Sequence, residues 1–243
     1  SSNRTPAGLE ALQRDLHLKS LPVTIEAIDI SGFQGTDKVG SVVTLLNGKP
    51  QRSRYRSFTI KTVEGSDDFA SIHEVVTRRF SGLQEREEPF PDLLLIDGGK
   101  GQLSSAVRAL NELGVEDVPV IGLAKRLEEV FVPGQSEPIL LPKASIALRL
   151  LLTIRDEAHR FAVKHHRTRR SSRTLSTSLT DIPGVGANRA RTLLRAFGSI
   201  KRIANASTEQ LAALDGISKA LAETVLEHLQ KELPIFKAFF LQK

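Results

Sequence analysis

A nine-residue segment near the middle of the chain constrains the fold more than any other. It reads PDLLLIDGG over residues 91–99, a continuous apolar run that ends in Asp and two glycines. Such a run is typical of a strand buried on both faces, as strands of parallel sheets are. The segment GQLSSAVRALNELG, residues 101–114, follows it with helical periodicity. Together these segments predict a strand, a tight turn and a helix, and therefore an α/β protein.

Segments on both sides of this unit add strands to the predicted sheet. Three upstream segments are β-branched or alternate apolar and polar residues: 24–31, 39–46 and 54–61. Asn47 and Gly48, between the last two, form a tight-turn signal, so we expect an antiparallel meander. Downstream, residues 118–124 indicate another buried strand, and residues 130–141, interrupted by two prolines, indicate a hairpin.

Helical patterns occur in three more segments: 7–18, 69–80 and 144–167. The second predicts one buried stripe of Phe69, Ile72, Val75, Val76 and Arg79. The third places Leu148, Leu151, Leu152, Phe161 and Ala162 inward. With the strands, this order predicts a mixed sheet covered by helices.

The last part of the chain has a different organisation. Residues 171–178, SSRTLSTS, have the small, polar composition of a flexible linker. Residues 179–243 read as helical throughout, with two similar turns whose first glycines, Gly184 and Gly216, are 32 residues apart. An internal duplication is the economical interpretation. We therefore predict a helical segment over 1–22, an α/β domain over 23–170, the linker, and a small all-α domain over 179–243.

The duplicated turn is a candidate phosphate site. Its glycines allow a sharp turn with outward backbone N–H groups, and the following helix adds its positive N-terminal end. The predicted contacts to nucleic acid are Gly184, Val185, Gly186, Arg189, Gly216, Ile217, Ser218 and Lys219. The alternative is that the glycines only cap helices; two copies beside basic residues favour binding.

A basic run is the second candidate for contact with a polyanion. Residues 160–173 carry six Lys or Arg, two His and no acid, within a chain of net charge +6. From this run we expect Arg160, Lys164 and Arg167 to contact a nucleic acid backbone. Lys100, in DGGKGQ, is a further candidate contact to a phosphate or a leaving group. The spacing around Lys100 does not match a P-loop.

Two aspartates and one histidine are candidates for chemistry. Asp29 lies near the end of the first predicted strand, and Asp97 ends the apolar strand. Two carboxylates at strand ends attract a hard divalent cation, which prefers oxygen ligands. His159 is a candidate metal ligand or general base if its ring faces them. The structural alternatives are a helix cap for Asp97, a turn for Asp29 and a solvated His159.

Composition narrows the class of site. The chain has 243 residues and no Cys, so any metal must use oxygen and nitrogen ligands, and a Cys nucleophile is excluded. No apolar run approaches the ~18 residues of a membrane span, and the start lacks a signal peptide. We expect a soluble, cytoplasmic protein. The chain begins without Met, and we expect it to be a fragment of something longer.

Several collinear motifs resemble the C-terminal half of the UvrC family. They include IEAIDISGFQG, PDLLLIDGGKGQL, VPVIGLAK, LRLLLTIRDEAHRFAVKHHR and the paired IPGVG and LDGISKALAETV, and the resemblance runs over residues 24–229. It implies an RNase H-like endonuclease domain followed by a tandem helix-hairpin-helix domain. The family's activity is the incision 5′ of a lesion in damaged double-stranded DNA, during bacterial nucleotide excision repair.

The resemblance also implies roles for particular residues. The family's Asp-Asp-His catalytic and metal-binding set falls on Asp29, Asp97 and His159, with one Mg²⁺ or Mn²⁺ as the simpler proposal. UvrB is the implied partner, although the segment through which the family meets it is absent from this chain. The alternative function is a non-catalytic DNA-binding and partner-docking module, with the acidic residues as caps.

Overall fold

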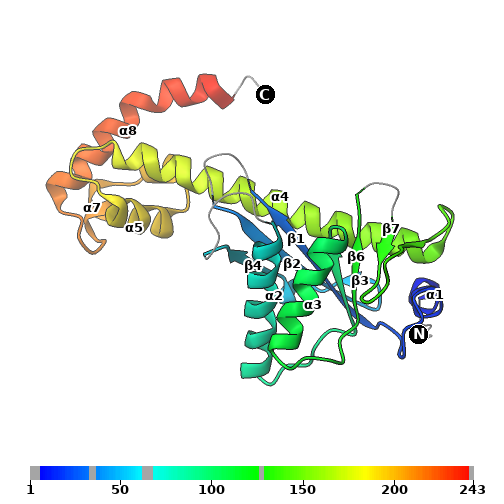
Figure 1. The fold of residues 1–243 in the computed structure, drawn as a ribbon. Coiled ribbons are helices and arrows are strands. Elements are labelled where there is room, and N and C mark those ends of the chain that lie inside the picture. The colour runs from blue at the N-terminus through cyan, green and yellow to red at the C-terminus, as the bar shows by residue number, and fades with distance from the viewer. Residues whose placement is uncertain (1–5, 33–36, 62–67, 126–128, 241–243) are drawn as a thin grey trace, which may run out of the picture. The chain divides into compact units, whose positions relative to one another are not determined.

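The computed structural model describes residues 6–32, 37–61, 68–125 and 129–240, with backbone only for 167–177 and 231–240 (Figure 1). Contacts divide the chain into two compact units, Ser1–His165 and His166–Lys243, which we describe separately. Helix α4 (Ile146–Thr180) belongs to both. None of the described helices is long and apolar enough to cross a membrane.

The first unit is built on one mixed sheet of eight strands. In the order β3-β2-β1-β5-β6-β7-β8, with β4 also paired to β2, the strands are β1 (Thr24–Ser31), β2 (Val39–Leu46), β3 (Lys49–Pro50), β4 (Arg56–Thr59), β5 (Leu93–Asp97), β6 (Val120–Leu123), β7 (Glu129–Phe131) and β8 (Ile139–Leu140). The pairs β1–β5 and β5–β6 are parallel, and all the other pairs are antiparallel. The mixed sheet predicted from the sequence is therefore confirmed.

The predicted meander is present in a modified form. Asn47 and Gly48 form the expected tight turn, with φ of 51° and 75°, and join β2 to β3. The strand after the turn ends at Pro50, because a short 3-10 turn (Arg52–Arg54) redirects the chain. Strand β4 then pairs with the first half of β2, from Val39 to Val42.

Helices cover both faces of this sheet (Figure 1). Helices α1 (Ala7–Asp15) and α4 pack on one face, and α2 (Asp68–Glu85) and α3 (Lys100–Glu112) pack on the other. Side chains alternate between the two cores, as the pleat of a strand requires. In β5, for example, Leu93 and Leu95 face α4, whereas Leu94 and Ile96 face α2 and α3.

Most of the predicted helix faces are confirmed. Ile72, Val75, Val76 and Arg79 of α2 are buried; in α4, Leu148, Leu151 and Ala162 are buried, and Leu152 and Phe161 pack against the same core. Phe69 is the exception, with 50% of its surface exposed. Its ring lies against Gly101, where an added Cβ would come within 2.7 Å of the ring. Phe69 therefore packs on the start of α3 instead of in the core.

The buried Arg79 is explained by an acid on the neighbouring strand. Its Nε and Nη2 atoms donate to the two carboxylate oxygens of Glu26 at 2.9 and 2.7 Å. Glu26 lies in the middle of β1 and is fully buried, and the hydroxyl of Thr44 donates to the same carboxylate. Because both charges are removed from water, replacing only one of the two residues should destabilise the fold more than replacing both.

The second unit is all helical, but its start differs from the prediction. Helix α4 ends at Thr180, whereas we expected a helix end near 167 and an irregular linker over 171–178. That segment contains no Gly or Pro, and Ser and Thr cost only a few tenths of a kcal/mol each in a helix. The backbone therefore continues as a helix. The predicted domain limits stay a proposal, although α1 of the segment 1–22 packs into the first core through Leu9 and Leu12.

Four further helices complete the second unit: α5 (Ala187–Phe197), α6 (Ile200–Ala204), α7 (Thr208–Ala212) and α8 (Lys219–Phe240). Their apolar faces share one core, which includes Leu179, Leu193 and Val225. The two predicted turns separate α4 from α5 and α7 from α8. The arrangement matches the duplication predicted from the sequence.

The Glu26–Arg79 pair yields a stability prediction. Arg79→Met leaves the buried carboxylate of Glu26 with only Arg54, at 4.0 Å, and the hydroxyl of Thr44 as partners among the described residues, and should lower the free energy of unfolding by about 3–5 kcal/mol. Glu26→Leu combined with Arg79→Met removes both charges and should recover most of that loss. Urea unfolding can be followed by the fluorescence of Tyr55, the only tyrosine of a chain without tryptophan. A double variant as unstable as Arg79→Met alone would contradict this account.

Candidate active site

The register of two parallel strands brings the candidate aspartates together. Strand β1 pairs with β5 from Ile25↔Leu93 to Ile28↔Ile96. The next step along both strands places Asp29 beside Asp97, about 4.8 Å away across the sheet. Asp29 and Asp97 each lie four residues after Ile25 and Leu93, whose side chains face α4. Because side chains alternate along a strand, both aspartates point to that same face. The carboxylates therefore lie side by side on the face that α4 covers.

The turn after β5 depends on a glycine of the neighbouring strand. A Cβ on Gly122 of β6 would lie 2.9 Å from the carbonyl oxygen of Gly98, so only glycine allows this approach. Gly99 is the N-cap of α3, and its N–H donates to Oε1 of Gln102 at 3.1 Å. Because Gly99 and Gln102 cap the helix, the interpretation of Asp97 as the cap of α3 is wrong.

Burial and like charge make the aspartate pair electrostatically unusual. Asp29 is only 5% exposed, and Asp29 Oδ2 and Asp97 Oδ1 are buried without a hydrogen-bond partner in the part of the chain that the structure describes. Burial, followed by the charge of Asp97, raises the pKa of Asp29 to about 6. His159 and Lys125 oppose this rise, so the pKa of Asp29 reflects a site with both signs of charge.

The imidazole of His159 reaches this pair from α4. Its Nδ1 lies 3.7 Å from Asp29 Oδ2, while 68% of the side chain remains exposed. Neighbouring charges on α4 are directed elsewhere: Glu157 accepts hydrogen bonds from Tyr55 Oη at 2.7 Å and from Arg160. His159 thus lies beside the buried carboxylate with one side open to solvent.

The two aspartates line a cavity of about 250 Å³ at this edge of the sheet. Its other polar lining residues are Asp68, Gln102 and Lys125. Asp68 is held by Lys38, whose Nζ lies 2.7 Å from Oδ1. Lys125 is not among the site residues predicted from the sequence. Its position directly after a predicted buried strand was the available signal, because parallel strands end at one edge.

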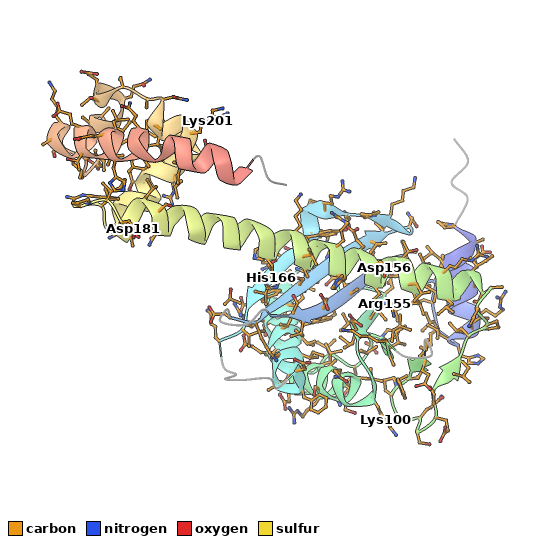
Figure 2. The ribbon with its side chains drawn as sticks, turned by 90° about the horizontal axis from the view of Figure 1, so that it is seen from above. Lys100, Arg155, Asp156, His166, Asp181 and Lys201 are labelled. Carbon is orange, nitrogen blue, oxygen red and sulfur yellow. The ribbon has the colours of Figure 1, made fainter. Side chains whose placement is uncertain are left out.

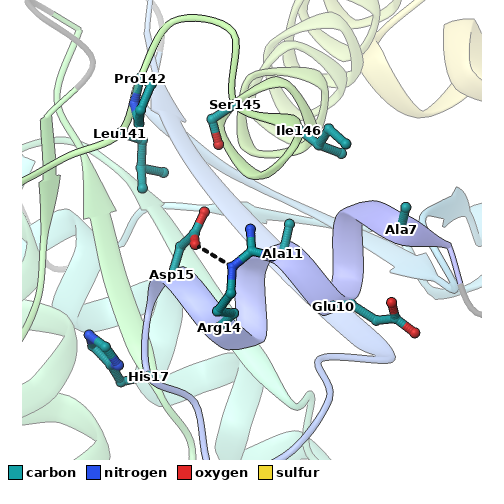
Figure 3. A pocket seen from close by; sticks show the side chains of 10 residues that line it. All are labelled: Ala7, Glu10, Ala11, Arg14, Asp15, His17, Leu141, Pro142, Ser145 and Ile146. Atoms are coloured by element: carbon teal, nitrogen blue, oxygen red, sulfur yellow. Dashed lines mark hydrogen bonds and ion pairs between the residues drawn. The ribbon is translucent and has the colours of Figure 1, made fainter.

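A larger groove lies away from these residues. It measures about 780 Å³ between α1 and the segment that joins β8 to α4 (Figure 3). Its charged side chains include Arg14 and Asp15, which pair with each other at 2.9 Å, as Figure 3 shows. The smaller cavity is the better candidate for chemistry, because the two residues whose buried carboxylate oxygens lack hydrogen-bond partners in the described part of the chain both line it.

The donor set of the smaller cavity suits a hard divalent cation. Two buried carboxylate oxygens without partners are the ligands that Mg²⁺ and Mn²⁺ prefer, and an imidazole nitrogen is the third donor nearby. Within the described residues, no group of three His, Cys, Asp or Glu side chains is already close enough to hold an ion. The residues fit such an ion chemically, with two preformed donors and His159 beside them.

The other candidate basic residues are distributed around the first unit and along α4. Lys100, labelled in Figure 2, donates to the carbonyl of Ser136 at 3.4 Å and lines a cavity other than that of the aspartates. Arg160 is ion-paired with Glu157 at 2.6 Å. Lys164 lies one turn further along α4, and the side chain of Arg167 is outside the described residues.

The two hairpin turns of the second unit have matching geometry. Gly184 and Gly216 adopt left-handed φ values of 84° and 80°, which strongly favour glycine. The side chains of Val185 and Ile217 are buried in the helical core, and their N–H groups donate to the carbonyls of Ile182 and Leu214 at 3.0 and 3.2 Å. Arg189 joins the turns, because its guanidinium donates to the carbonyls of both glycines at 2.8 Å.

The helix starts after these turns differ in their caps. Gly186, the N-cap of α5, provides no side-chain acceptor, which leaves the first-turn N–H groups available. In the second copy, Ser218 Oγ accepts from the N–H of Leu221 at 3.2 Å. Lys219 is exposed in the first turn of α8. The α5 turn is therefore the more open anion site of the two.

Comparisons with known proteins cover almost the whole chain. A model of the UvrC RNase H endonuclease domain matches residues 13–163, and one of a SAM-like helix-hairpin-helix tandem matches residues 176–231. UvrABC system protein C of Prosthecochloris aestuarii is 51% identical over 96% of this chain and 37% of the relative. The protein of that name from Methanococcoides burtonii is 50% identical over 91% and 37%. The chain thus spans just over a third of the length of these relatives.

Similarity to solved structures is more distant. Endonuclease V of Ciona intestinalis, in complex with DNA containing an inosine, is 16% identical over 54% of this chain and 59% of that chain, with a TM-score of 0.36. XPF of Aeropyrum pernix, in complex with DNA, is 18% identical over 66% and 72%, with a TM-score of 0.22. Neither structure is similar enough to this chain to indicate its function. By the family model that spans most of its length, the chain belongs to the UvrC RNase H endonuclease domain family, with a helix-hairpin-helix tandem after that domain.

Proposed function

We propose that this chain is a divalent-metal-dependent DNA endonuclease that makes the incision 5′ of a lesion during nucleotide excision repair. One observation carries the proposal: Asp29 and Asp97 lie side by side and line one cavity, and each has a buried oxygen without a hydrogen-bond partner among the residues that the structure describes. A buried pair of like charges is costly, and such arrangements concentrate at functional sites. Membership of the UvrC family supplies the reaction class.

In this proposal Asp29, Asp97 and His159 hold one Mg²⁺ or Mn²⁺. When bound, the ion polarises the scissile phosphate and makes an attacking water more acidic. The two carboxylates provide the negative charge that holds the ion, and both must be ionised to do so. His159 contributes a ring nitrogen 3.7 Å from the buried Oδ2 of Asp29, and the imidazole itself is open to solvent. Its neutral form can bind the ion or accept a proton from water.

The helical unit holds the DNA in this proposal. The proposed contacts run from Gly184 to Gly186 and from Gly216 to Ser218, with Lys219 adding charge. The N–H groups that point to the phosphates are those of the glycines and Ser218, because the N–H groups of Val185 and Ile217 donate to carbonyls within their own turns. Contacts of this kind carry no base readout, so binding is independent of sequence. Arg189 supports them indirectly, because it fastens the two turns together. The basic residues Arg160, Lys164, Arg167 and Lys100 are proposed backbone contacts.

The wider role rests on the relatives, of whose length the chain spans just over a third. We propose that the complete protein acts on damaged double-stranded DNA in the cytoplasm, with UvrB as partner. Lesion choice then belongs to the assembly, and this chain alone should cut weakly.

A second candidate function has one observation in its favour. Because no three-residue metal cluster is assembled among the described residues, a DNA-binding module that only docks a partner is the alternative. Both functions predict DNA binding. Only the nuclease predicts cleavage that depends on a cation and on single carboxylates.

Nicking of supercoiled DNA separates the two functions. With Mg²⁺ or Mn²⁺ the wild-type chain should convert supercoiled plasmid to the open circle, and chelation should stop it. Asp29→Asn and Asp97→Asn should lower the rate at least a hundredfold, and His159→Ala somewhat less, because each removes a donor to the ion. Glu112→Gln, on the outer face of α3, is the matched control. Unchanged nicking by any one site variant would remove that residue from the site.

The pKa of Asp29 provides a test that needs no cleavage. Its folded-state pKa of about 6 exceeds the ordinary 3.8, so the folded state binds the proton more tightly. Its contribution to stability is present below pH 4 and is lost as the pH rises through 6. Asp29→Asn should therefore raise the free energy of unfolding at pH 8 by up to about 3 kcal/mol, with no gain at pH 4.

The same measurement with added cation tests the site directly. Mn²⁺ at pH 8 should stabilise the wild type through preferential binding to the folded state, and should leave Asp29→Asn unchanged. Tyr55 fluorescence reports the first unit during urea unfolding. Equal stabilisation of both proteins by Mn²⁺ would place the cation elsewhere.

Salt dependence tests the proposed DNA contacts. If about four phosphates are neutralised, the logarithm of the association constant should fall with log salt at a slope of roughly −4. Lys219→Ala should reduce the magnitude of that slope by about 0.9, the share of one phosphate. Lys201→Ala, on α6 and outside both hairpins, should leave the slope unchanged. A flat salt response of the wild type would refute binding through phosphates.

A further inference from the structure

We propose that Lys125 is a catalytic residue of this site and binds the scissile phosphate through its ammonium group. The inference rests on the proposed nuclease function and adds a component that neither the carboxylates nor the imidazole supplies. The observation behind it is the position of Lys125 in the wall of the cavity that Asp29 and Asp97 line.

The sheet fixes the backbone of Lys125 at this place. Strand β6 pairs in parallel with β5, and Asp97 lies opposite Leu123, the last residue of β6. Lys125 follows two residues later, at the edge where β1 and β5 also end. Side chains at the carboxyl ends of neighbouring parallel strands meet in one crevice, which is where α/β proteins bind ligands. The strand order therefore places Lys125 at the cavity that the two aspartates line.

The charge of Lys125 is available to a ligand. Among the described residues its ammonium has no ion pair, and it is exposed. Two other lysines, by contrast, already have partners: Lys38 pairs with Asp68 at 2.7 Å, and Lys100 donates to the carbonyl of Ser136. Lys125 also acts on the site electrostatically, because its charge lowers the pKa of Asp29 against the effect of burial. Its ammonium therefore interacts with the carboxylate while remaining open to solvent.

A phosphodiester entering this cavity needs such a cation. The phosphate is an anion and meets two carboxylates, so repulsion opposes its approach unless positive charge is near. In hydrolysis, a water oxygen bonds to phosphorus while the bond from phosphorus to the leaving sugar oxygen breaks. The proton released by the water is balanced by the proton taken up by the leaving oxygen. Lys125 keeps its own proton and donates hydrogen bonds to a non-bridging oxygen, whose charge increases during the reaction.

Single-turnover nicking of bubble-containing DNA by the full chain with Mn²⁺ tests this role. Lys125→Met should lower the rate constant at saturating protein at least a hundredfold, while the dissociation constant for DNA changes less than threefold. Lys125→Arg keeps the charge and should recover at least a tenth of the wild-type rate. Lys143→Met, an exposed lysine before α4, is the matched control and should match the wild type. A rate for Lys125→Met within threefold of wild type would overturn the proposal.

A binding measurement separates failure of this inference from failure of the proposed function. In Ca²⁺, the wild type should bind a phosphodiester bubble more tightly than one whose single-stranded segment carries uncharged methylphosphonates. Lys125→Met should reduce that preference two- to threefold, and Lys143→Met should preserve it. An unaltered preference in Lys125→Met would refute the phosphate contact. If the wild type nicks no DNA but Lys125→Met still reduces the preference, the nuclease function is contradicted and the phosphate contact is supported.

Discussion

The parallel pairing of β1 with β5 is the constraint on which the rest of the site depends. Its register carries Asp29 and Asp97 to the same step of the sheet, on the same face. Side-chain burial on β1 holds this register, because a slip by one residue would move Ile25 and Ala27 out of the α4 core and turn Glu26 away from Arg79. The same apolar packing that forms the sheet therefore positions two carboxylates that repel each other.

Strand β1 carries two buried acids that differ in their hydrogen-bond partners. Glu26 faces α2 and has both oxygens bonded to Arg79, so its charge is fully compensated. Asp29, three residues later, faces α4 and keeps one oxygen without a hydrogen-bond partner within the described residues, with His159 3.7 Å away. Unlike Glu26, Asp29 has no arginine bonded to its carboxylate in the described ranges, and His159 and Lys125 only partly offset the effect of burial on its pKa. We attribute that difference to a bound cation and a substrate, for which Asp29 is kept available.

The sequence predicted the sheet and the carboxylates because both follow from local pattern. The run before Asp97 has no polar interruption, and Asn47 with Gly48 permits few conformations other than a tight turn. The partner of Arg79 was not predictable, since Glu26 is 53 residues away and only the register brings it close. Phe69 followed the helical period but meets Gly101 instead of the core. Lys125 was missed because its role comes from the strand order, which a single strand does not reveal.

The most direct test of the account is where a cation binds. Crystals of the chain grown with Mn²⁺ near pH 8 can be measured for anomalous scattering at the manganese edge. The account predicts one peak within about 2.5 Å of both Asp29 Oδ2 and Asp97 Oδ1, on the side that faces His159. A peak elsewhere on the molecule, with these two oxygens free of metal, would contradict it.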